Sequence, residues 1–138
     1  MLDFFKNLFG SKHERDVQSL WPVVAEINAF TETLQGLTDD ELKAKTPEFR
    51  QRIDEATAEI KDEIAKLQER LKEDIPFSER EGIYNELDEL NKHLDATIRE
   101  TLDEILPEAF AVVKETCRRL VGQSWDVAGN KTIWDMVP

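Results

Sequence analysis

The 138 residues are enough for one ordinary domain with a hydrophobic core. A composition of 40% hydrophobic and 35% charged residues excludes a disordered chain and favours a soluble helical protein. The net charge of -12 argues against nucleic-acid binding, because phosphate groups require a basic surface.

The cysteine content and the hydropathy pattern suggest a compartment. Cys117 is the single cysteine and cannot form an intramolecular disulfide, which favours a reducing environment. No apolar run approaches the roughly 20 residues that span a bilayer. Residues 1–10 are too short and too charged for the apolar segment of a signal peptide. A cytoplasmic chain is expected.

The first fifteen residues predict a short amphipathic helix. Its large apolar side chains are Leu2, Phe4, Phe5, Leu8 and Phe9. Such a helix is suited to a membrane surface or to a partner helix. The alternative is a terminal helix packed on its own protein, and the small number of nearby Lys and Arg residues favours that alternative.

Residues 17–34 predict a second helix, which Gly36 would end with a left-handed cap. Thr38 and Glu41 have the spacing of a capping box that opens a short helix. Thr46 followed by Pro47 then predicts the start of another helix, because proline is favoured at the first helical position.

Residues 47–74 carry the most regular pattern, an approximate eleven-residue apolar repeat that stays nearly straight along a helix. Its members are Phe49, Ile53, Ala56, Ile60, Ile64, Leu67, Leu71 and Ile75. A break at 75–77 and a capping box of Ser78 with Glu81 predict a second long helix. Its apolar positions are Ile83, Leu87, Leu90, Leu94, Ile98, Leu102 and Ile105. Two matched helices with a short connection predict an antiparallel hairpin.

The charge is concentrated on this hairpin. Residues 39–104 contain 21 acidic and 11 basic side chains, whereas residues 105–138 are neutral in sum. The ordinary explanation of such a charge pattern is a solvated helical surface.

A fresh helix is predicted from Pro107, with Gly122 as its end. Beyond it, Gly129 and Asn130 can form a two-residue turn. That turn would place Val127 opposite Thr132 and Trp125 opposite Trp134. The expected fold class is therefore all-α, a helical bundle dominated by a long antiparallel α-hairpin, with a small β-hairpin near the C-terminus.

Residues suited to catalysis or metal binding are scarce. The five glycines are dispersed, so no phosphate-binding loop is predicted. His13 and His93 lack the spacing of a zinc-peptidase helix or of a di-iron bundle. Cys117 lies on an apolar helix face, where a buried thiol is the ordinary case. Taken alone, the chain is expected to have no catalytic site, metal or cofactor.

Three stretches resemble one family, the SecA motor ATPases of bacterial preprotein translocation. They are LDFFKNLFGSKHERD (2–16), INAFTETLQGLTDDELKAKTPEFRQRI (27–53) and LPEAFAVVKETCRRLVG (106–122), in the order that the family has. They cover more than half of the chain, and the run PEAFAVV is the most specific. The chain is similar to the N-terminal part of such a motor and is expected to end before its phosphate-binding loop.

The resemblance implies three segments. Residues 1–53 would be the first helices of the motor, residues 54–104 an inserted acidic helical hairpin, and residues 105–138 a helix and β-like segment that leads into the first nucleotide-binding domain. Most family members have a much shorter link in place of 54–104. Met136 corresponds in position to a methionine that lines the family's adenine pocket, although a plain hydrophobic strand end is the favoured alternative.

The family's role implies the partners. SecA proteins use ATP and magnesium to push preproteins through the SecYEG translocon, dock on anionic membrane at the inner face of the plasma membrane, and often dimerise. This chain would supply scaffold and contact surface, with the hairpin as an accessory contact arm, and is expected to self-associate through exposed apolar surface. The alternatives are a free-standing coiled-coil adaptor without a link to ATP and a membrane-surface module acting through residues 1–15.

Overall fold

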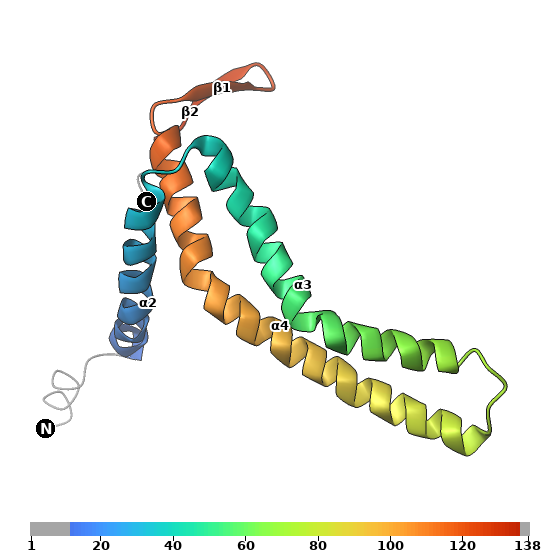
Figure 1. Cartoon of the computed structure of the whole chain (residues 1–138). Helices are drawn as coiled ribbons and strands as arrows, with labels where there is room; N and C mark the ends of the chain where they lie inside the picture. The colour runs from blue at the N-terminus through green and yellow to red at the C-terminus, as the bar shows by residue number, and fades with distance from the viewer. Residues whose placement is uncertain (1–11, 136–138) are drawn as a thin grey trace, which may run out of the picture. The chain divides into compact units, whose positions relative to one another are not determined.

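The computed structural model describes residues 12–135, which form three helices and one two-stranded antiparallel sheet (Figure 1). The elements are α2 (Lys12–Leu34), α3 (Asp39–Arg70), α4 (Phe77–Leu120), β1 (Ser124–Val127) and β2 (Asn130–Ile133). This confirms the predicted fold class. Within the described residues, no helix combines the length and the apolar character needed to cross a membrane.

The chain divides into two compact units. The base unit comprises the described residues of Met1–Leu42 and of Pro107–Pro138, and the hairpin unit comprises Lys43–Leu106. The helices α3 and α4 each contribute to both units. The hairpin unit contains the predicted insertion, 54–104, whose status as an insertion stays a prediction.

The core of the base unit is small. Leu34, Leu42 and Ala111 are buried, with Ala111 fully so. Partly buried apolar side chains pack against them, namely Ile27, Phe30, Leu37 and Val112. Because alanine adds little bulk, α4 can approach the end of α2 and the start of α3 closely at Ala111.

The core of the hairpin unit joins the two long helices, as the apolar repeat predicts. Its buried members are Ile60, Ile64, Ile75, Ile83 and Leu87, and its partly buried members are Leu67, Leu71, Leu90 and Leu94. These positions recur every three or four residues on each helix, so each helix buries one side.

Two predicted core positions in the hairpin unit were wrong. Ala56 and Leu102 are exposed, and the neighbouring residues Thr57 and Thr101 are buried instead. The Thr57 hydroxyl donates a hydrogen bond to the Ile53 carbonyl at 2.7 Å, and Thr101 bonds the Thr97 carbonyl at 2.8 Å. Because a threonine hydroxyl can bond a carbonyl one turn earlier, these residues enter a core without an unpaired polar group.

The predicted breaks before Pro47 and Pro107 were also wrong. Both prolines lie inside continuous helices, α3 and α4. A proline inside a helix costs one backbone hydrogen bond, and tertiary packing outweighs that cost when it fixes the helix on both sides. Leu42 before Pro47, and Ile105 and Ala111 around Pro107, are buried.

Two predicted caps differ from the structure. Gly36 does not take a positive φ, and α2 ends at Leu34 in a turn that the Leu37 amide closes on the Leu34 carbonyl. The helix α4 begins at Phe77, with the Pro76 carbonyl accepting its first bonds, so Ser78 is already helical. Gly122 has a φ of 81° and ends α4 as predicted.

The β-hairpin exists, but its predicted register was wrong by two residues. Val127 pairs with Asn130, and Trp125 pairs with Thr132. The turn is Ala128–Gly129, both with positive φ, and the Asp126 carboxylate accepts a hydrogen bond from the Gly129 amide. A shift of two residues keeps every side chain on its face, so Trp125 and Trp134 still meet diagonally, with ring centroids 5.9 Å apart.

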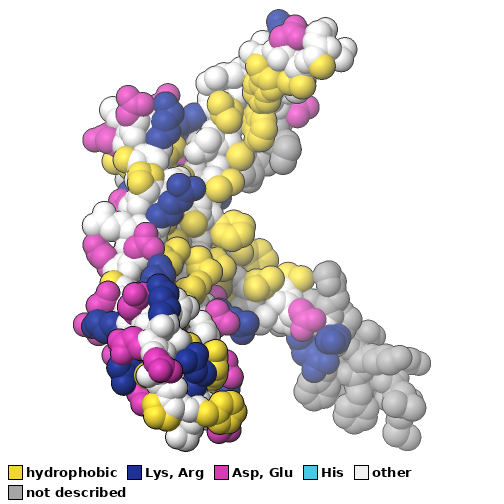
Figure 2. Space-filling model, turned by 90° about the vertical axis from the view of Figure 1, so that its right-hand side faces the viewer, with side chains coloured by type: hydrophobic (Ala, Val, Ile, Leu, Met, Phe, Trp, Pro, Cys, Tyr) yellow, Lys and Arg dark blue, Asp and Glu magenta, His cyan; other side chains and the backbone are white. Residues whose placement is uncertain are grey.

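The surface carries charged side chains over the helices and apolar side chains both on the β-hairpin and on α2 and α4, where Trp21, Phe110 and Val113 are exposed. Figure 2 shows Lys, Arg, Asp and Glu side chains interspersed on the helices, and hydrophobic side chains gathered on the strands at the top of the view. Both strands are exposed along their length, and their large hydrophobic residues are Trp125, Val127 and Ile133.

Candidate functional site: the Arg119 network

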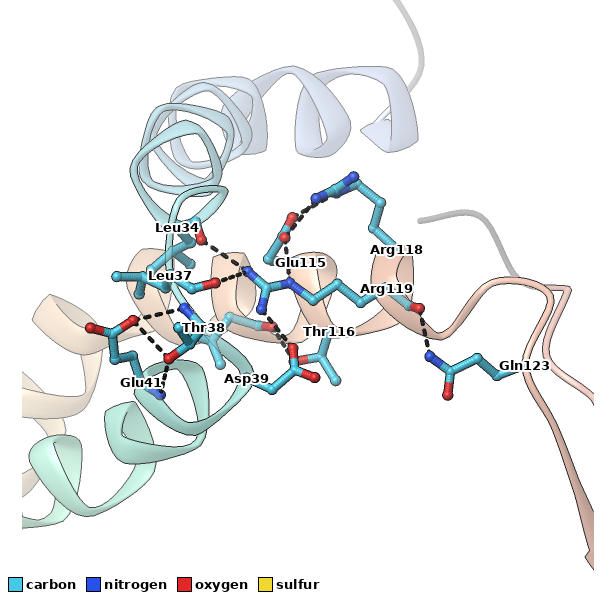
Figure 3. A network of polar contacts seen from close by, with 11 residues as sticks. Leu34, Leu37, Thr38, Asp39, Glu41, Glu115, Thr116, Arg118, Arg119 and Gln123 are labelled. Atoms are coloured by element: carbon cyan, nitrogen blue, oxygen red, sulfur yellow. Dashed lines mark hydrogen bonds and ion pairs between the residues drawn. The ribbon is translucent and has the colours of Figure 1, made fainter.

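The densest polar cluster of the base unit surrounds Arg119, near the end of α4 (Figure 3). Its guanidinium donates hydrogen bonds to the carbonyls of Leu34 at 3.2 Å and Leu37 at 2.8 Å. It also pairs with the Asp39 carboxylate at 2.8 Å and the Glu115 carboxylate at 2.7 Å. We call Leu34, Leu37, Asp39, Glu115, Arg118 and Arg119 the Arg119 network. One side chain thereby holds the connection between α2 and α3 against α4.

Glu115 is the buried anion of the network. Its side chain is fully buried and accepts hydrogen bonds from Arg118 and Arg119, all at 2.7 Å. Hydrogen bonding from Arg118, then from Arg119, together with their positive charges, lowers the pKa of Glu115 to about 2, although burial opposes this shift. Glu115 is therefore ionised at neutral pH and is not suited to proton transfer.

The start of α3 is fixed by a reciprocal capping box, as the sequence predicts. The Thr38 amide donates to the Glu41 carboxylate at 2.7 Å, and the Glu41 amide donates to the Thr38 hydroxyl at 3.3 Å. This cap places Asp39 in the first helical turn, where a carboxylate also favours the helix dipole. The cap thus positions the Asp39 carboxylate for Arg119.

A further contact joins α4 to α2. Lys114 Nζ donates a hydrogen bond to Asn28 Oδ1 at 2.8 Å. Lys114 and Arg119 lie on different parts of the α4 surface, so α4 contacts α2 through Lys114 and the loop after α2 through Arg119. These contacts are structural: they hold α2 and the loop after it against α4, and each polar side chain named here has a hydrogen-bond partner.

The turn of the hairpin unit has its own pair of arginines. Arg70 pairs with Glu73 and, at 2.9 Å, with Glu79 on the other helix. Arg80 donates hydrogen bonds to the carbonyls of Leu71 at 3.2 Å and Glu73 at 3.4 Å. These bonds join the connection between α3 and α4 to both helices.

The residues singled out from the sequence fall in different places. Met136 and the apolar set Leu2, Phe4, Phe5, Leu8 and Phe9 lie outside the described residues. Cys117 is half-buried on α4. In the part of the chain that the structure describes, no group of three or more His, Cys, Asp or Glu side chains is arranged to hold a metal ion.

Sequence reasoning missed the Arg119 network, although part of its signal was present. Glu115, Arg118 and Arg119 have the i, i+3 and i+4 spacing at which a helical carboxylate meets two guanidiniums. The two carbonyl partners carry no signal in the sequence, because every residue has a carbonyl.

Comparisons with known proteins identify relatives along the whole chain. Residues 5–128 match the family model "SecA DEAD-like domain". Proteins named "Protein translocase subunit SecA" align with all of the chain: that of Salinibacter ruber is 45% identical over 158 residues, that of Chloroherpeton thalassium 42% over 139, and that of Chlorobium phaeovibrioides 43% over 139. The chain spans only 13–14% of the length of these relatives. No solved structure matches.

Proposed function

The chain belongs to the SecA family, and on that premise we propose that it is a non-catalytic scaffold and contact segment of a protein-translocation motor. The base unit is the scaffold, and the hairpin unit is an accessory contact arm. The parent motor binds ATP and magnesium elsewhere and exports preproteins through SecYEG at the inner face of the plasma membrane.

The observation that carries this proposal is the hairpin unit. Residues 43–106 have a hydrophobic core of their own and contain 18 acidic and 11 basic residues, most of them exposed. The two helices of this hairpin bury one side against each other and leave their other sides exposed. Such a unit is suited to presenting a surface to a partner.

The base unit supports the scaffold role. Arg119 joins residues 115–119 to residues 34–39 by bonds to Leu34, Leu37 and Asp39, and Glu115 holds its guanidinium. The segments that precede and follow the hairpin unit in the chain are therefore held together by contacts of the base unit alone. A scaffold of this kind keeps its geometry when the hairpin engages a partner.

The test replaces residues 54–104 by a short Gly/Ser linker in the SecA protein that carries this segment. Basal ATP hydrolysis should stay within about twofold, because the chemistry lies elsewhere, while preprotein transport into membrane vesicles should fall by about fivefold or more. Unchanged transport would overturn the contact arm. An unrelated helical hairpin of equal length is the control, and full rescue by it would indicate a spacer instead of a contact surface.

A further inference from the structure

Two aromatic side chains stand out on the surface of the hairpin unit. Phe77, the first residue of α4, is 82% exposed, and Tyr84 is 53% exposed. They lie seven residues apart, which is two helical turns, so both rings are on the same side of α4. Large aromatic rings contribute most when buried, and their exposure at one site is typical of a binding surface.

Acidic residues interleave with these rings. Glu81 and Asp88 follow Phe77 and Tyr84 by four residues each, so they lie on the same side of the helix. Both carboxylates are on exposed residues. We call Phe77, Glu81, Tyr84 and Asp88 the aromatic–acidic face.

Two basic side chains lie near this face, and each has a hydrogen-bond partner outside it. Residues 77–98 contain six acidic residues and two basic ones, Arg80 and Lys92. Arg80 bonds the carbonyls of Leu71 and Glu73, and Lys92 pairs with Glu89 at 2.7 Å while its charge also acts on Asp88. Since six acidic residues outnumber these two cations, the face stays negative in sum.

From this placement we propose that the aromatic–acidic face binds a basic, amphipathic segment of a partner protein. Its Lys and Arg side chains pair with Glu81 and Asp88 and lie over the two rings, and its apolar side chains cover the ring edges. A cation over an exposed aromatic ring contributes roughly 0.5–1 kcal/mol, and more when water is excluded. The inference deepens the proposed function, on which it rests, by naming the face of the arm and the chemistry of its partner.

Charge excludes the other occupants. A nucleic acid or an anionic membrane would be repelled by the carboxylates. A second copy of the chain in a two-fold contact would present the same acidic side, because such a contact pairs identical surfaces. A cationic segment alone satisfies both the rings and the carboxylates.

The test uses the full chain and a fluorescent 18-residue helical peptide of Lys and Leu, with a Glu and Leu peptide of the same pattern as its negative control. Peptide affinity is measured by anisotropy for F77A/Y84A and for E81K/D88K. Both variants should bind the Lys peptide about tenfold or more weakly, because each removes one half of the face. The Glu peptide should not bind the unmodified protein.

The matched control is E86K/E100K, which makes the same charge change on another side of α4. Glu86 lies two residues from Tyr84, about 200° around the helix. Its affinity for the Lys peptide should equal that of the unmodified protein. An equal loss in this control, or undiminished binding by F77A/Y84A, would overturn the proposed face.

Two further outcomes would also overturn it. One is binding of the unmodified protein to anionic vesicles that F77A/Y84A abolishes, and the other is a dimer in sedimentation that F77A/Y84A dissociates. Circular dichroism of each variant shows whether it folds. The linker replacement tests the contact arm separately: transport lost on replacement with peptide binding unaffected by F77A/Y84A would refute the face and leave the arm.

Discussion

At the scale of single residues, Arg119, held by Glu115, joins α4 to the end of α2 and the start of α3. The apolar core of the base unit has three buried members, Leu34, Leu42 and Ala111. Arg119 reaches four acceptors from one position, which a lysine could not do because its ammonium lacks the planar fork. In this unit, charge-assisted bonds complement a small hydrophobic core.

The ionisation of Glu115 predicts a pH dependence. Its pKa in the folded protein, about 2, lies below the ordinary value of 4.5, so its contribution to stability is complete above pH 4.5 and is lost as the pH falls towards 2. Glu115→Gln should lower the free energy of unfolding at pH 7 by about 1–3 kcal/mol, a range reduced for the exposure of Arg118. Between pH 4.5 and 2 the difference between the two proteins should shrink.

Urea denaturation at several pH values measures this difference, with exposed Glu86→Gln as the control. A difference that stays constant across the window would show that the Glu115 carboxylate gains nothing from its two arginines.

At the scale of elements, the hairpin unit shows which positions of a predicted apolar repeat are buried in the structure and which are not. Leu87 and Leu102 belong to the same predicted repeat of α4, yet Leu87 is 9% exposed and Leu102 is 46% exposed. The repeat continues in the sequence, whereas the buried position moves to Thr101. The core therefore follows the contact with the facing helix, not hydrophobicity alone.

This pair of leucines gives a matched test of the core. Leu87→Ala should cost about 2–5 kcal/mol of unfolding free energy, because it removes buried methyl groups and leaves a cavity. Leu102→Ala should cost less than about 0.5 kcal/mol, as for an ordinary surface substitution. Thermal or urea unfolding measures both, and equal costs would contradict the assigned core.

The turn of the β-hairpin gives a second test at this scale. Ala128 has a φ of 51°, which is strained for a residue with a Cβ. Ala128→Gly should stabilise the hairpin by up to about 1 kcal/mol, because glycine adopts positive φ without that strain. Tryptophan fluorescence follows the Trp125–Trp134 pair during unfolding, and a lower midpoint for Ala128→Gly would refute the assigned turn.

At the scale of the whole molecule, the sequence predicts the helices and the β-hairpin better than it predicts their boundaries, the strand register and the contacts between elements. The hairpin and the helix that ends at Gly122 follow from periodicity and capping, which are local signals. Pro47 and Pro107 predict helix starts because proline breaks helices locally, but both lie inside helices, where packing overrides that preference. The strand register was misplaced because nothing local shows that Ala128 adopts positive φ. The Arg119 network could not be predicted, because the carbonyls that Arg119 bonds lie about 80 residues away in the chain.

The Arg119 network also bears on how this segment could evolve. Its members all lie in the base unit, outside residues 43–106. The two chain segments that flank the hairpin unit are therefore held together by contacts that do not depend on the length of the hairpin. Doubling a closed loop costs only about 0.6 kcal/mol, so whole helical turns can be gained or lost with little penalty to the base. Each residue added to both helices would extend the reach of the tip by about 1.5 Å. Related proteins can therefore differ in the length of the hairpin while keeping the same Arg119 network in the base unit.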